Sequence, residues 1–209
     1  MKTWLITECS SGFGRNLAET LLSEGEQVIV TARKPKTIQH FAKNYPLTAL
    51  CLRLDVTKKD TIDATVNAAI EKFGKIDVLI NNAGYCLRGA VEECTEEEIY
   101  AEFNTNFFGA VRMIQAVLPH MRKAGIGAII NYSSIAALDT SAGSAFYGAA
   151  KCALEGLSCG LRKEVEPLGI KAMVVEPGPF KTDFFDRSID INPNRIAAYD
   201  DTVSYTHLR

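Results

Sequence analysis

The stretch WLITECSSGFGRNLAETL, residues 4–21, predicts an apolar strand that runs through a glycine-containing turn into a helix. Gly12 and Gly14 stand where the helix would begin, so backbone N–H groups and the positive end of the helix dipole can face a phosphate group. Glu8 departs from this pattern, because a phosphate-binding turn is expected to carry glycine at that position.

The same alternation of strand and helix continues along the chain. Short apolar runs predict strands at residues 3–7, 28–32, 50–54, 78–80, 128–132 and 172–175. Strands that are apolar throughout are buried on both faces, which is typical of a parallel sheet covered by helices on each side. With right-handed crossovers, this pattern predicts a doubly wound parallel sheet in a three-layer α/β/α fold.

Segments of helical period lie between the predicted strands. Residues 15–24 and 61–73 each place apolar side chains on one stripe, as helices that cover a sheet do. A longer helix is predicted from about residue 95 to residue 121, although it contains FNTNFFG, residues 103–109, which is rich in weak helix formers. Something other than helix propensity must favour that stretch.

The composition suits one globular domain, which we place at residues 1–200. Hydrophobic residues make up 47% of the 209, and 23 Lys plus Arg against 25 Asp plus Glu give a formal charge of -2. Without a basic block or tail, nucleic acid is not an expected partner. The N-terminus resembles neither a secretory signal nor a membrane span, so we expect a cytoplasmic protein that does not bind membranes.

The end of the chain has a different character. Residues 201–209 show no periodic pattern and no capping residues. We interpret them as an irregular tail, and we hypothesise that the reading frame is truncated and that the last residues are not native sequence.

Two other chemistries are not predicted. The six cysteines form no C-x-x-C pair and have no nearby histidines, so no metal site is expected. GLSCG, residues 156–160, fits the G-x-S-x-G pattern of serine hydrolases. That motif needs a preceding strand and a downstream histidine, whereas residues 149–155 continue a helix and His207 lies in the tail.

Tyr147 and Lys151 are four residues apart and would share one face of a helix. With this pair, the chain resembles the short-chain dehydrogenase/reductase family, which carries a T-G-x-x-x-G-x-G turn, an N-N-A-G stretch, a catalytic serine and a Y-x-x-x-K pair. The corresponding positions are residues 7–14, residues 81–84, Ser134 and the Tyr147/Lys151 pair. The resemblance implies a Rossmann-like fold. Because the family adds a strand after its substrate loop, it also implies a sheet that lacks the last strand.

The resemblance further implies an oxidoreductase that transfers a hydride between NADP(H) and a carbonyl or secondary alcohol. Tyr147 would act as the general acid or base at the substrate oxygen. A free tyrosine, with a pKa of about 10, is a weak base at neutral pH, so we predict that the Lys151 ammonium lowers this pKa. Ser134 would hold the substrate oxygen, with Ser133 as a competitor for that role. Asn106 would interrupt its helix and hold a water molecule that relays protons to the lysine.

Arg33 favours NADP over NAD as the cofactor. It follows the second predicted strand, where Thr31 and Ala32 provide no carboxylate for the ribose 2′-hydroxyl, and an arginine suits a 2′-phosphate. The resemblance implies further cofactor contacts from Thr7, Ser10, Ser11, Gly12, Phe13, Gly14, Asp55, Val56, Asn82, Ala83, Gly84, Tyr147, Lys151, Pro177, Gly178 and Thr182.

Glu8 leaves two hypotheses open. If its carboxylate points toward the pyrophosphate, like charges about 6 Å apart repel by roughly 3 kcal/mol, which weakens binding about a hundredfold. The first hypothesis is a working oxidoreductase. The second is a protein with the dinucleotide fold that does not catalyse, either a binding protein or an inactive fragment. The working enzyme would act on a small-molecule carbonyl or alcohol whose identity the sequence does not specify, and the resemblance allows a homo-oligomer.

Overall fold

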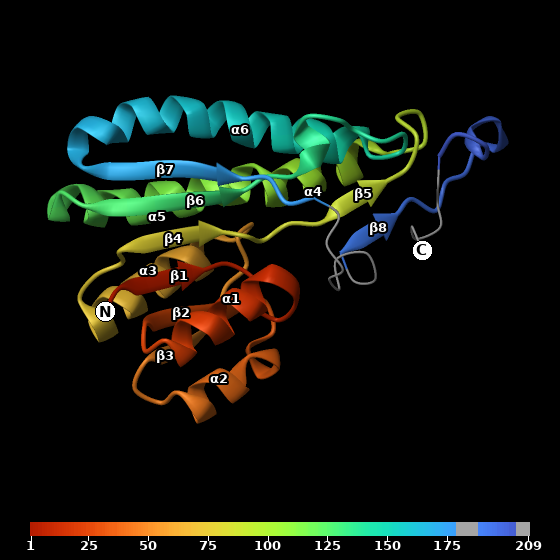
Figure 1. The fold of residues 1–209 in the computed structure, drawn as a ribbon. Helices are drawn as coiled ribbons and strands as arrows, with labels where there is room; N and C mark the ends of the chain where they lie inside the picture. Colours follow the sequence, from red (N-terminus) through yellow and green to blue (C-terminus); the bar gives the residue numbers. More distant parts are fainter. Residues whose placement is uncertain (179–187, 204–209) are drawn as a thin grey trace.

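A six-stranded parallel sheet forms the centre of the molecule in the computed structural model, which describes residues 1–178 and 188–203 (Figure 1). The strand order is β3-β2-β1-β4-β6-β7, so the chain winds outward in both directions from β1 and β4. The strands are β1 (Thr3–Ile6), β2 (Gln27–Ala32), β3 (Ala49–Arg53), β4 (Val78–Asn81), β6 (Gly127–Tyr132) and β7 (Ile170–Val175). The predicted doubly wound α/β fold is confirmed.

Alternate side chains of the central strands enter two separate cores. Leu5, Ile29 and Leu79 belong to one buried cluster, whereas their sequence neighbours Ile6, Val30 and Ile80 belong to the other. In register, Leu5 lies between Ile29 and Leu79. The central strands are therefore apolar on both faces, and this is why they read as continuous apolar runs in the sequence.

Helices cover both faces of the sheet. They are α1 (Gly12–Ser23), α2 (Gln39–Asn44), α3 (Lys59–Phe73), α4 (Glu96–Asn106), α5 (Phe108–Ala124) and α6 (Ala145–Val165). Side chains of α1 and α2 pack into the cluster that contains Ile6, and those of α3 and α5 pack into the cluster that contains Leu5. Helix α6 runs alongside β7 and packs against α4 (Figure 1).

The structure divides the predicted helix of residues 95–121 into α4 and α5, so it is not one continuous helix, and the interruption that the resemblance implies at Asn106 is present. Phe107, between the two helices, has φ −113° and ψ −64°, outside ordinary helical geometry. Asn106 donates from its side chain to the carbonyl oxygen of Tyr85 (2.7 Å) and accepts from the Tyr85 amide (3.0 Å). These contacts to a distant loop favour a stretch of weak helix formers at the break.

Two three-residue strands were not predicted. β5 (Cys86–Arg88) and β8 (Ile189–Ile191) pair in parallel and form a small second sheet beyond the carboxyl end of the main one (Figure 1). The buried carboxylate of Glu93 accepts from the backbone amides of Ala90 (2.7 Å) and Ile196 (2.8 Å). The segment after residue 187 is therefore held against the loop between β5 and α4.

The serine-hydrolase pattern at residues 156–160 lies inside α6, as predicted. Ser158 is buried and donates to the carbonyl oxygen of Leu154 (2.6 Å), so its hydroxyl is not accessible to a substrate as a nucleophile. Of the predicted tail, residues 201–203 form a turn and a bend, and the remainder lies outside the described residues. Within residues 1–178 and 188–203, no helix combines the length and apolar character needed to cross a bilayer.

Candidate active site

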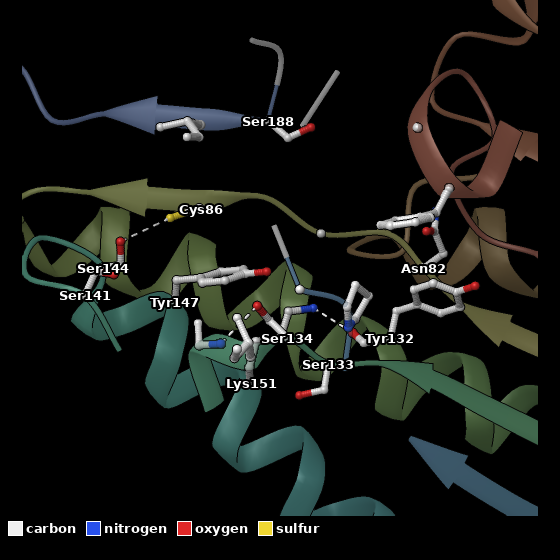
Figure 2. A pocket seen from close by; sticks show the side chains of 18 of the residues that line it. Asn82, Cys86, Tyr132, Ser133, Ser134, Ser141, Ser144, Tyr147, Lys151 and Ser188 are labelled. Atoms are coloured by element: carbon white, nitrogen blue, oxygen red, sulfur yellow. Dashed lines mark hydrogen bonds between the residues drawn. The ribbon is translucent and has the colours of Figure 1, made fainter. Parts of the chain in front are cut away.

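The carboxyl ends of four parallel strands, β1, β4, β6 and β7, lie at the same edge of the sheet. The turn that begins α1 follows β1, Asn82 follows β4, Ser134 follows β6 and Pro177 follows β7. In an open parallel sheet, carboxyl strand ends next to the point where the strand order reverses form a crevice. A cavity of about 420 Å³ occupies this position (Figure 2).

Many of the predicted site residues share this cavity. Its lining includes Ser11, Gly12, Phe13, Asn82, Gly84, Ser134, Tyr147, Lys151, Pro177 and Gly178. The glycine-containing turn and the Tyr147/Lys151 pair therefore belong to one site, although more than 130 positions separate them in the sequence. Thr182 lies outside the described residues.

Thr7 and Asn82 join the ends of β1 and β4. The buried Thr7 hydroxyl accepts from the backbone amides of Asn82 and Ala83, both at 2.9 Å. The Asn82 side chain donates to the carbonyl oxygens of Thr7 (2.9 Å) and Glu8 (2.8 Å). Thr7 and Ala83 thus do not line the cavity themselves, but the hydrogen bonds of Thr7 hold the turn after β1 against the end of β4.

The turn requires glycine at position 14. A Cβ atom there would collide with the carbonyl oxygen of Glu8 and lie 2.6 Å from Asn82 Nδ2. Because Gly14 has no Cβ atom, the first turn of α1 packs closely against the backbone after β1, and the N-terminus of α1 is directed at the cavity. Phe13 extends from the turn toward β6, where its ring centroid is 5.9 Å from that of Tyr132.

The Glu8 carboxylate turns back onto the turn itself. Its Oε1 accepts from the backbone amide of Ser10 (3.0 Å) and from the Ser10 hydroxyl. Glu8 has φ 60°, in the left-handed region that disfavours residues with a side chain, and it lines the cavity. One backbone donor of the turn is thus satisfied by a carboxylate of the protein.

The structure separates the two candidate serines. Ser133 points away from Tyr147 and donates to Glu155 Oε1 (2.6 Å) on α6 (Figure 2). The Ser134 side chain is hydrogen-bonded to Tyr147, and its oxygen also accepts from the amide of Ala136 (3.1 Å). Of the two serines, Ser134 is the one that lies against the phenol.

The predicted lowering of the Tyr147 pKa by Lys151 is wrong for this structure. Burial raises the pKa of Tyr147 to about 12; the hydrogen bond with Ser134 opposes the shift, and Cys86 and Glu102 add to it. Lys151 Nζ lies 5.6 Å from the centroid of the Tyr147 ring and donates to the carbonyl oxygen of Tyr132 (2.8 Å). The ammonium therefore contacts the ring and the end of β6, while desolvation determines the pKa of the phenol.

Lys151 is itself almost fully buried, at 4% exposure. Burial lowers its pKa to about 8, and the nearby Glu102 opposes that shift. Asn106 lies close to both Lys151 and the cavity wall. A Cβ atom on Gly84 would be 2.5 Å from Asn106 Oδ1 and 3.5 Å from Lys151 Nζ, so only glycine fits between them.

The predicted adenine-side residues lie apart from the cavity lining. Arg33 is exposed after β2, and Asp55 accepts from the Thr57 amide (3.0 Å) and hydroxyl (2.7 Å). Burial by itself raises the pKa of Asp55, but the bonds from Thr57 and the positive charges of Arg33 and Lys58 together lower it. Arg33 and Asp55 are therefore near one another, whereas Val56 is buried in the core.

Sequence reasoning missed one wall of the cavity. Side chains from β5, β8 and the loop after Ser134 complete the lining: Cys86, Arg88, Ile135, Asp139, Ser141, Ser144, Ser188 and Ile189. Most of these residues could have been suspected because they follow shortly after the N-N-A-G stretch or after Ser134 in the sequence. The contribution of residues 188 and 189 depends on the pairing of β5 with β8, which has no sequence pattern.

A doubly wound sheet with a glycine turn and a Tyr/Lys pair at its carboxyl edge defines a Rossmann-like protein. The sequence profile described as short chain dehydrogenase matches residues 2–191, and the chain belongs to this family.

Curated relatives carry reductase and oxidoreductase names. A 3-ketodihydrosphingosine reductase of Bacteroides thetaiotaomicron is 46% identical over 182 residues, which cover 87% of this chain and 65% of that reductase. Oxidoreductase calM of Penicillium decumbens is 40% identical over 190 residues, covering 87% of this chain and 62% of that protein. The chain thus spans less than two thirds of the length of both relatives.

Solved structures show the same architecture. A short-chain dehydrogenase from Streptomyces avermitilis has a TM-score of 0.92 and 41% identity, covering 97% of this chain and 76% of that one. ElxO with NADP bound has a TM-score of 0.82 and 35% identity, covering 87% and 75% of the two chains.

Proposed function

We propose that the protein reduces a carbonyl group to an alcohol with NADPH, with Tyr147 as the proton donor. The observation that carries this proposal is the shared cavity, which the turn of residues 11–13 lines together with Ser134, Tyr147 and Lys151. A dinucleotide anchored at the turn and a substrate beside the phenol would thus meet in one space. The oxidoreductase names of the relatives support the same assignment.

The residues fit a dinucleotide at most points of the turn. Glycine at position 14 lets α1 approach β1, and the N–H groups at the start of α1 are available to a phosphate. Ser11, Phe13, Asn82 and Gly84 would hold the cofactor, which when bound supplies the hydride. The Glu8 carboxylate opposes an anion here, because it already accepts a hydrogen bond from the Ser10 amide.

Tyr147 is suited to give a proton to the substrate oxygen. Its raised pKa, about 12, keeps the phenol protonated at neutral pH, which is the form that a general acid requires. Ser134, hydrogen-bonded to the phenol, would hold the substrate oxygen beside it. In the reverse direction the phenol would first have to lose its proton before it could accept one from an alcohol.

Lys151 and Asn106 support the phenol from below. The buried ammonium, held by the Tyr132 carbonyl group, places a positive charge under the Tyr147 ring and would stabilise negative charge left on the phenol oxygen. Asn106, close to Lys151, is positioned to assist proton resupply. We assign these four residues, Asn106, Ser134, Tyr147 and Lys151, as the catalytic set.

NADP is the proposed form of the cofactor. The end of β2 carries Arg33 and no carboxylate, which suits a 2′-phosphate. ElxO, which is 35% identical, has been solved with NADP bound. We further propose that Asp55 and Val56 lie on the adenine side and that Pro177, Gly178 and Thr182 lie on the nicotinamide side.

Oxidation of NADPH in the presence of candidate carbonyl compounds tests the proposal. The substrate panel should include 3-ketodihydrosphingosine, after which the Bacteroides relative is named, together with small ketones, sugars, steroids and retinoids. We expect Tyr147→Phe to lose turnover by about 10²- to 10⁴-fold while its NADPH fluorescence titration stays like that of the wild type. Turnover that survives this substitution would contradict the mechanism.

Glu8 favours a second candidate function, a dinucleotide-fold protein that does not catalyse. A carboxylate seated on the Ser10 amide competes with the pyrophosphate for that donor. Fluorescence titration separates the two functions, because a working reductase must bind NADPH at accessible concentrations. If no binding is detected at millimolar NADPH, the reductase assignment fails for this chain.

A further inference from the structure

Glu102 is a fully buried carboxyl group beside the candidate site. It lies on α4, one turn before Asn106, and has 0% exposure. Its Oε1 accepts from Asn106 Nδ2 (2.7 Å), and its Oε2 accepts from the backbone amide of Leu87 (3.2 Å). Carboxylates are seldom buried completely, because desolvation of the charge is costly unless other groups compensate for it.

The carboxyl group determines which way the Asn106 amide points. Asn106 Oδ1 accepts from the Tyr85 amide, while Nδ2 donates both to the Tyr85 carbonyl oxygen and to Glu102. If the amide were flipped, its oxygen would face two acceptors and its nitrogen would face the Tyr85 N–H donor. An acceptor at position 102 therefore reinforces a single orientation of Asn106.

Glu102 also acts electrostatically on Lys151. Burial raises the pKa of Glu102 to about 8, and the Leu87 amide, Lys151 and Asn106 oppose that shift. For Lys151 the signs are reversed, since burial lowers its pKa to about 8 and Glu102 raises it. The ionisable groups that interact with Glu102 come from several elements: Tyr85, Cys86, Cys94, Tyr147, Lys151 and Asp190.

Among these groups Lys151 is the one that can carry a positive charge, since the others are tyrosines, cysteines and an aspartate. We propose that Glu102 is a positioning residue, which orients the Asn106 amide and keeps the Lys151 ammonium charged in a water-poor site. The catalytic consequence rests on the proposed function, whereas the coupling between the two charges does not.

Titration of Lys151 tests the coupling without any need for turnover. Isotope-labelled lysine NMR, with the Lys151 signal assigned by its loss in Lys151→Arg, would compare the wild type with Glu102→Gln. Because an opposite charge favours the charged form, the substitution should lower the pKa of Lys151 by about 1. Glu97→Gln, which removes an exposed carboxylate from the same helix, should leave the Lys151 titration unchanged.

Glu102→Asp keeps the charge and should leave the Lys151 titration close to that of the wild type. The kinetic counterpart is the alkaline limb of kcat/KM for carbonyl reduction, which should move to lower pH in Glu102→Gln and not in Glu102→Asp. A role in packing alone would not produce this difference. If the wild type shows no turnover, the proposed function fails and the NMR titration still decides the role of Glu102.

An unchanged Lys151 titration in Glu102→Gln would overturn the proposal. Should that variant fail to fold, the Glu102 carboxyl carbon can be titrated in the wild-type chain. Loss of the ammonium in Lys151→Met should raise the pKa of Glu102 above its wild-type value, because an opposite charge favours the carboxylate, and an unchanged Glu102 pKa would equally overturn the proposal.

Discussion

The carboxylate of Glu8 accepts hydrogen bonds from the backbone amide of Ser10, at 3.0 Å, and from the Ser10 hydroxyl. Ser10 lies on the turn that leads into α1, where N–H groups face the cavity. An anionic group of the protein thus occupies one donor of a turn whose geometry suits a phosphate. Glu8 acts on this turn through both its charge and its backbone conformation.

Glu8→Gly should strengthen NADPH binding. Removal of the charge frees the Ser10 amide and abolishes a repulsion of roughly 3 kcal/mol for charges about 6 Å apart, equivalent to about a hundredfold in Kd. Glu8→Gln should gain less, because its amide oxygen can still accept from Ser10. Fluorescence titration of the three proteins measures the effect, and equal affinities would show that the carboxylate does not oppose the cofactor.

The backbone at position 8 leads to a separate prediction about stability. At φ 60°, a residue with a Cβ atom is strained by roughly 1–2 kcal/mol relative to glycine. Glu8→Gly and Glu8→Ala both lose the bonds to Ser10, so the difference between them isolates this strain. The glycine variant should melt about 2–4 °C above the alanine variant for each kcal/mol of strain. Identical Tm values in thermal unfolding would indicate that the turn relaxes around alanine.

Much of the fold follows from periodicity in the sequence. The six strands of the main sheet coincide with the apolar runs, most clearly at β1, β2 and β4, whose two faces are both buried. The pairing of β5 with β8 could not be predicted, since three-residue strands carry no pattern and their partners are more than 100 positions apart. The break between α4 and α5 could be expected only from the family resemblance, because it depends on contacts between Asn106 and the distant Tyr85.

The site was predictable where a motif fixes residue types and spacing, and less so where burial matters. The family resemblance, which rests on the order and spacing of the motifs, predicts that Tyr147, Lys151 and the turn share one site. The predicted direction of the Tyr147 pKa shift is wrong, because burial of the phenol raises its pKa and burial has no signature in the Y-x-x-x-K motif. Glu102 is indistinguishable in the sequence from the exposed glutamates before it, and only the packing of α4 against α6 reveals its burial.

Ser134→Ala should impair catalysis much more than Ser133→Ala. Ser134 is hydrogen-bonded to Tyr147, whereas the Ser133 hydroxyl is directed to Glu155. Loss of a hydrogen bond to developing charge costs about 1.5–3 kcal/mol, so kcat/KM for Ser134→Ala should fall by roughly 10- to 100-fold. Ser133→Ala should instead lower the Tm slightly and retain most of the activity. The reverse ranking in steady-state kinetics would exchange the roles of the two serines.

Arg33→Ala should reduce the preference for NADPH over NADH. The exposed guanidinium after β2 can pair with a 2′-phosphate, and loss of a bond to a charged group costs about 1.5–3 kcal/mol, or at least tenfold in Kd. NADH affinity should stay unchanged, because that cofactor lacks the phosphate. Arg162→Ala, an exposed arginine at the end of α6, serves as the matched control. A parallel loss of affinity for both cofactors would assign Arg33 to a general electrostatic effect.

The rate of carbonyl reduction should fall as the pH rises through about 8. Lys151 has its pKa lowered to about 8 by burial, so below this pH the ammonium is present and above it the positive charge under the Tyr147 ring is lost. Tyr147, with its pKa raised to about 12, remains protonated across this range and does not contribute the change. Thus kcat/KM should be level below the Lys151 pKa and decline by up to about tenfold per pH unit above it. Lys151→Arg, whose guanidinium stays charged, should lose this alkaline limb, and a limb that persists in this variant would assign the titration to another group.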